Sequence, residues 1–89
     1  MLLNNLFSYL YKKRSEETDT IKKSAYSTVL NCLENRCSYS IESARNTIVS
    51  EQGYCSYLKS NIKRGTNRYK FLTEVINLFD SCLSLINLP

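Results

Sequence analysis

The sequence has no histidine, and it has only two glycines and one proline among its 89 residues. Histidine is the commonest general base and metal ligand, and it activates most Ser and Cys nucleophiles, so its absence argues against most enzymes. Two glycines cannot build the common phosphate-binding loops. Sandwiches and barrels need many turn residues, so scarce Gly and Pro favour a few long helices. We therefore predict a protein that is not an enzyme and has no cofactor.

Long apolar runs are also missing. No uncharged stretch approaches the ~20 residues that a membrane span needs. The apolar start of the chain is interrupted by Asn, and its positive charges, Lys12 to Arg14, follow the apolar residues instead of preceding them as in a secretory signal. We expect a single helical domain over residues 1–89 with no membrane span, in the cytoplasm of a microbe or of an infected host cell.

Four cysteines could in principle form two disulfides or a zinc site: Cys32, Cys37, Cys55 and Cys82. Without a secretory signal we expect free thiols, although the sequence leaves their redox state open. The spacing of Cys32 and Cys37 is at the edge of that of zinc ligands, but the other two cysteines have no local partner, so we predict no metal. Cys55, near Lys59, is the one candidate nucleophile, and we interpret it as a buried thiol.

The most informative positive feature is the apolar segment from Phe71 to Leu88. At helical spacing one face carries Leu72, Val75, Ile76, Phe79, Leu83 and Ile86, and a second row carries Phe71, Leu78, Cys82 and Leu85. A helix that is apolar over most of its circumference lies either in the centre of a bundle or in an interface with another chain. The candidate interface residues are Phe71, Val75, Leu78, Cys82 and Leu85.

Three earlier segments also have helical periodicity. Residues 2–13 carry an apolar edge of Leu2, Leu3, Leu6, Phe7 and Leu10. A second helix, ending near Asn35, repeats apolar residues every four positions: Ile21, Ala25, Val29, Leu33 and Cys37. A third begins at the predicted N-cap Ser40, turns Ile41, Ala44 and Ile48 inward, and ends at Gly53, and the pattern leaves open whether Val49 also faces inward. Together these segments predict an all-α bundle of four to five helices.

The stretch from Tyr54 to Arg64 fits either a helix or a strand, because its aromatic residues also suit a sheet. Residues 62–72, with Gly65 in a basic tip, resemble the wing hairpin of winged-helix transcriptional regulators. The resemblance implies an α+β fold with a hairpin at about residues 54–71, and contact with DNA. It covers about a third of the chain, and only one helix fits where that family has two closely spaced helices. This fold is the alternative to the bundle.

Basic residues are concentrated between positions 59 and 70: Lys59, Lys63, Arg64, Arg68 and Lys70. Tyr54, Tyr57 and Tyr69 are interspersed among them. Such cations could neutralise phosphates while tyrosines stack on bases, or the segment could be a solvated connector between helices. The net charge of +4 is too small to require nucleic acid.

These features predict a non-enzymatic protein that binds and modulates another macromolecule. The expected partner is a protein or a second copy of the chain, as for inhibitors, immunity proteins, chaperones and host or phage antagonists. The helix order is broadly similar to that of small four-helix bacteriocin immunity proteins. The alternative is a small DNA-binding regulator that uses a basic wing or loop at residues 59–70. No small-molecule substrate is expected.

Overall fold

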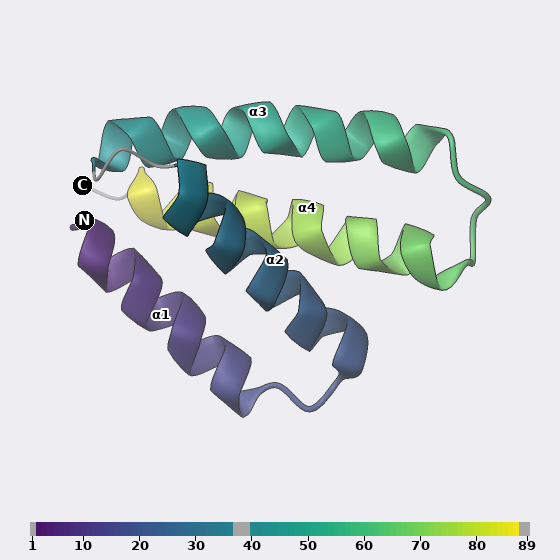
Figure 1. Ribbon diagram of the computed structural model, residues 1–89, viewed down its shortest axis with the longest axis horizontal. Helices are drawn as coiled ribbons and strands as arrows, with labels where there is room; N and C mark the ends of the chain where they lie inside the picture. Colours follow the sequence, from purple (N-terminus) through teal and green to yellow (C-terminus); the bar gives the residue numbers. More distant parts are fainter. Residues whose placement is uncertain (1, 37–39, 88–89) are drawn as a thin grey trace.

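A computed structural model describes residues 2–36 and 40–87 of the chain. It has four helices, α1 (Leu3–Glu16), α2 (Thr20–Arg36), α3 (Ile41–Ser60) and α4 (Asn67–Ile86), and these described residues contain no strand (Figure 1). The predicted all-α bundle is confirmed, with four helices. The α+β alternative is wrong, because the segment expected to form its hairpin is divided between α3, a short turn and α4.

The helix α3 runs without a break through Gly53, where the sequence predicted a helix end. It continues because Cys55 and Leu58 extend its buried face for another two turns. The chain turns at residues 61–66 instead, and there Gly65 supplies a positive φ of 86°. An L-residue with a side chain rarely adopts that conformation, so this glycine has a backbone role that Gly53 does not have.

Short polar side chains define where the helices begin. The Ser40 hydroxyl accepts a hydrogen bond from the backbone N–H of Ser43 at 3.0 Å, which confirms the predicted N-cap of α3. Thr66 accepts from the N–H of Tyr69 at 3.2 Å at the start of α4. Each bond satisfies one backbone donor that a helix start leaves without an intrahelical partner.

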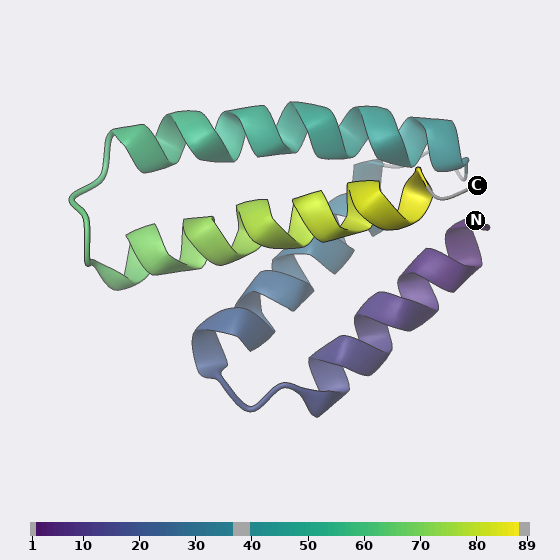
Figure 2. The same ribbon diagram turned by 180° about the vertical axis from the view of Figure 1, so that it is seen from behind.

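The helix α4 is the centre of the bundle. It packs against α3 as an antiparallel hairpin, against α2, which crosses this pair, and to a smaller extent against α1. Figures 1 and 2 show the start of α1 and the end of α4 at one end of the molecule, and the α3–α4 turn at the opposite end. None of the described helices is long and apolar enough to cross a membrane.

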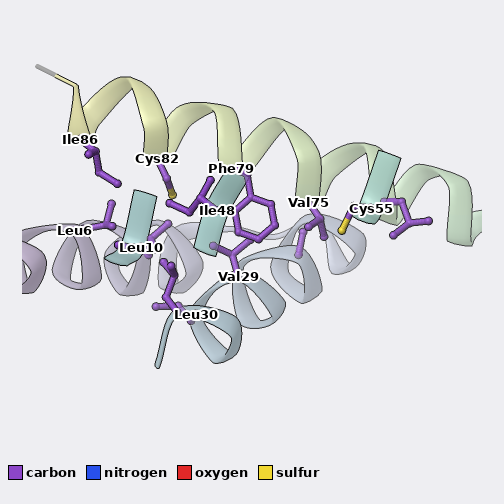
Figure 3. Close-up of a cluster of buried hydrophobic side chains, with 14 residues drawn as sticks. Leu6, Leu10, Val29, Leu30, Ile48, Cys55, Val75, Phe79, Cys82 and Ile86 are labelled. Carbon is purple, nitrogen blue, oxygen red and sulfur yellow. The ribbon is translucent and has the colours of Figure 1, made fainter. Parts of the chain in front are cut away.

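All four helices contribute to one hydrophobic core (Figure 3). Its largest fully buried side chains are Phe79, Leu6, Leu10, Leu30, Leu33 and Ile48. The predicted helical spacing of α4 is confirmed through Ile86, whereas Leu88 and Cys37 lie outside the described residues. Leu2, which was predicted to face inward, is 72% exposed, and Val49, which the pattern left open, is 56% exposed.

Candidate functional site

The predicted interface on α4 is partly occupied by the protein's own core. Val75 is 1% and Cys82 0% exposed, so neither can offer surface to a partner while the chain has this fold. Phe71, Leu78 and Leu85 are half-buried and pack against the core. The broad apolar circumference of α4 is therefore covered mainly by the other helices, as in the central-helix interpretation.

Of the five large apolar side chains that are exposed, three lie on α3, and the other two are Leu2, just before α1, and Tyr11 on α1. Val49 is 56%, Tyr54 54% and Tyr57 67% exposed. Val49, Gly53 and Tyr57 follow one another at intervals of four residues, so they form a line along one side of the helix. That side is opposite Ala44 and Cys55, which face the core. No other helix covers it in either view of the molecule (Figures 1 and 2).

We define the outer face of α3 by its eight exposed positions from residue 46 to residue 60: Asn46, Val49, Ser50, Gly53, Tyr54, Ser56, Tyr57 and Ser60. None of these positions is charged, whereas the exposed positions of α1, α2 and α4 include Lys12, Lys22 and Asp80. Interfaces are depleted of charge at their centre and enriched in Tyr. The outer face shares these two features with protein interfaces, although three of its eight positions are Ser, which interfaces contain less often.

Gly53 lies at the middle of the outer face. Apart from its two chain neighbours and the backbone of its own helix, no atom lies within 4 Å of the position that its Cβ would occupy, and its φ is not positive. Neither packing nor backbone conformation within one described chain therefore requires glycine here. A helical glycine is roughly 1 kcal/mol less favourable than alanine. In return, it lets the backbone of another chain approach α3 closely.

Replacing the two glycines with alanine should change stability in opposite directions. Gly53→Ala should raise the free energy of unfolding of dilute protein by about 0.5–1 kcal/mol through helix propensity. Gly65→Ala should lower it by about 1–2 kcal/mol, because alanine is strained at positive φ. Chemical denaturation measures both values. If Gly53→Ala lowered the free energy of unfolding as much as Gly65→Ala does, this account of Gly53 would be contradicted.

The second exposed surface is the basic turn, defined by Lys59, Lys63, Arg64, Arg68 and Lys70. Its five cations exceed the net charge of +4, so the rest of the sequence carries −1. Helix stability does not explain why cations are concentrated here. Arg68 and Lys70 occupy the first turn of α4, where the helix dipole disfavours cations. The structure brings all five predicted residues to one end of the molecule.

An open pocket of about 500 Å³ lies beside the basic turn. Lys59 and Arg64 border it, together with Tyr69. The ammonium nitrogen of Lys59 lies 4.9 Å from the centroid of the Tyr69 ring, at cation–π distance. Both of these side chains are half-buried, whereas Arg64 is exposed and free to reach a ligand.

The described cysteines, Cys32, Cys55 and Cys82, are free thiols. Burial raises the pKa of each, and it raises the pKa of Cys82 to about 12. A thiol with a raised pKa is protonated at neutral pH and is a poor nucleophile, which disfavours Cys55 in catalysis. Within residues 2–36 and 40–87, no cluster of three or more Cys, Asp or Glu side chains could hold a metal ion.

Sequence reasoning missed the outer face of α3, because it interpreted Gly53 as a helix end and left open whether Val49 faces the core. The available signal was the absence of charge from residue 52 to residue 58, next to a helix already predicted. Comparison with protein-family models, with curated proteins and with solved structures found no match to this chain. Any functional conclusion therefore depends on the two surfaces described above.

Proposed function

We propose that this protein is not an enzyme and acts by binding another protein chain through the outer face of α3. One observation carries the proposal: the eight exposed positions of α3 between residues 46 and 60 have no charge, and among them are three large apolar side chains that no other helix covers. A face that served only to keep the helix hydrated would carry charges, as the other helices do. The inhibitor, immunity, chaperone and antagonist types all remain compatible with such a role.

The outer face has the physical properties that binding requires. Val49, Tyr54 and Tyr57 are attached to a continuous helix of 20 residues, about 30 Å long, so little backbone freedom is lost on association. Tyrosine combines a large apolar ring with a hydroxyl that can still form a hydrogen bond. The complementary surface on the partner would be another uncharged helix or a shallow apolar groove. The predicted contacts of Phe71, Leu78 and Leu85 on α4 are not needed for it.

The test compares two doubly substituted variants of equal charge. Val49→Glu with Tyr57→Glu places two carboxylates on the outer face, and Thr28→Glu with Asn31→Glu places two on exposed positions of α2. We expect the first variant to bind at least tenfold more weakly, because buried unpaired charge is costly. This loss should apply both to self-association and to the binding of other proteins from extracts of the source cells. The α2 variant should bind like the unmodified protein. Equal binding by both variants would contradict the proposal, provided that circular dichroism shows both to be folded.

The basic turn supports a second candidate function, binding of a nucleic acid through its phosphate backbone. The observation in its favour is that five cations, and no acidic residue, lie between Glu51 and Glu74, beside a pocket bordered by Tyr69. The cations would neutralise phosphates, and the tyrosine ring offers a surface on which a base can stack.

Fluorescence anisotropy with labelled duplex DNA and single-stranded RNA tests the second candidate. Neutralising three to five phosphates should give a slope of about −2.7 to −4.5 with duplex DNA, and of about −2.1 to −3.5 with single-stranded RNA, in a plot of log K against log salt concentration. Lys63→Glu with Arg68→Glu should abolish binding, whereas Lys12→Glu with Lys22→Glu, which changes the charge equally on other helices, should cost less than about threefold. Equal losses for both pairs would mean that only overall charge matters, and would rule this function out.

A further inference from the structure

We infer that the chain which covers the outer face of α3 is a second copy of this protein, packed with its α3 antiparallel to the first about a twofold axis at Gly53. The inference rests on the proposed function and identifies the partner. It follows from the order of side chains along α3 and from the charges at the two ends of the outer face.

Reversal about Gly53 pairs six of the other seven positions of the outer face with one another, whereas Tyr54 comes opposite Gln52, which is half-buried. An antiparallel pair places Val49 opposite Tyr57 of the partner subunit, and Tyr57 opposite the partner subunit's Val49. Asn46 and Ser60 are related in the same way, as are Ser50 and Ser56. Packed helix axes lie 8–10 Å apart according to the side chains between them, and two facing glycines allow the lower end of that range. The contact would then cover the exposed valine and Tyr57 in both copies.

The charges at the ends of α3 are complementary in the same arrangement. Glu42 is exposed in the first turn of α3, while Arg64 is exposed in the turn that follows the last residue of α3, Ser60. Arg64 lines a pocket with Ser56 and Ser60, so it lies beside the far end of the outer face. Within the part of one chain that the structure describes, neither Glu42 nor Arg64 has an ion-pair partner. An antiparallel pair brings each of them to the opposite charge on the other copy.

A parallel pair would have the opposite electrostatics. It would place Arg64 and Lys63 against the same cations of the second copy, and Glu42 against the partner subunit's Glu42, so both ends would repel. The helix dipoles would also be aligned instead of opposed. Closed twofold symmetry is the commonest arrangement of homo-oligomers. The area that one helix pair covers is at the small end for stable interfaces, so we expect a dissociation constant on the order of tens of micromolar.

Sedimentation velocity of the full chain between ~1 µM and ~1 mM tests the inference, because that range spans the expected dissociation constant. Gly53→Gln should weaken self-association at least tenfold while leaving the monomer folded, since the new Cβ meets no atom within 4 Å besides its chain neighbours and the backbone of its own helix. Thr28→Gln, on the exposed side of α2, is the matched control and should have no effect. A protein that stays monomeric at ~1 mM, or a dimer that Gly53→Gln leaves unchanged, would overturn the inference.

A charge exchange tests the orientation separately. Glu42→Arg and Arg64→Glu should each weaken the dimer about fivefold, and the two together should restore it to within about threefold of the original, as expected when opposite charges are exchanged across an interface. Residue 42 lies in the first turn of α3 and residue 64 lies just beyond its other end, so a helix about 30 Å long separates them and they cannot rescue each other within one chain. Failure of the double variant to recover would overturn the antiparallel pairing.

The outcomes also distinguish this inference from the proposed function. The protein could be monomeric and yet lose the binding of a different protein when Val49→Glu and Tyr57→Glu are introduced together. In that case the outer face of α3 binds another protein, and only the inference of self-association is wrong. If the protein is monomeric and no binding depends on the outer face, both proposals fail.

Discussion

Phe79→Ala is expected to lower the free energy of unfolding by about 3–5 kcal/mol. Phe79 is the largest fully buried side chain, with 1% of its surface exposed, and lies near the middle of α4. Its ring points from α4 toward Val29 of α2 and Ile48 of α3 (Figure 3). Alanine would leave a cavity where three helices meet. Because small domains are stable by only about 5–15 kcal/mol, this single change should remove a large part of the total.

Urea denaturation followed by circular dichroism measures this loss. Asn77→Ala is the matched control, because it lies in the same helix, two residues away, and is exposed. It should change stability by less than about 0.5 kcal/mol. If Phe79→Ala cost less than about 1 kcal/mol, the ring could not occupy a tightly packed core, and the placement of α4 between α2 and α3 would be wrong.

Alkaline pH should destabilise the protein through Cys82. Burial raises the pKa of this thiol from 9.0 to about 12. Below pH 9 the thiol is protonated in both the folded and the unfolded chain, and its contribution to stability is complete. Above pH 9 the unfolded chain loses the proton first, so unfolding becomes more favourable until the folded thiol also titrates near pH 12. The loss is about 1.4 kcal/mol per pH unit, or about 2 kcal/mol at pH 10.5.

Comparison with Cys82→Ala isolates this effect. The variant loses packing at every pH but no longer has the buried thiol, so the stability difference between the two proteins should narrow by about 2 kcal/mol between pH 8 and pH 10.5. The pKa values of Cys32 and Cys55 are also raised by burial, but these groups are present in both proteins and their effects cancel. The pKa of Tyr26 is raised mainly by burial but also by Cys82, and the part due to Cys82 does not cancel. A difference that is constant over this pH range would show that the Cys82 thiol is hydrated in the folded state.

Local patterns were sufficient to predict four helical segments, but not the end of α3. Ala25, Val29 and Leu33 recur every four residues and are all buried in α2, because helical geometry places that spacing on one side. A strand would place Ser27 and Asn31 on the same face, and these residues are polar. Ser40 was recognisable as an N-cap because its hydroxyl can satisfy a backbone donor at a helix start. The lack of glycine and proline excluded most folds rich in turns. None of these inferences requires knowledge of the neighbours of a helix.

Only the packing of the helices decided which apolar residues are buried. The sequence showed that α4 is apolar over most of its circumference, but this pattern is the same for a central helix and for an interface. The contacts of α2 and α3 with α4 make it a central helix, and they bury Val75 and Cys82. Gly53 is similar. Local propensity favours a helix end there, but burial of Cys55 and Leu58 beyond it stabilises a continuous α3.

Of the two candidate surfaces, one could be predicted from the sequence and the other required the structure. The five cations of the basic turn are close together in the chain, so they were found before the fold was known. The outer face of α3 could be recognised only once the opposite side of that helix was known to be buried, because exposure depends on contacts between segments that are distant in the sequence. Periodicity within a segment therefore determined the helices of this protein, and the burial of each helix against the others determined which surface remains to bind a partner.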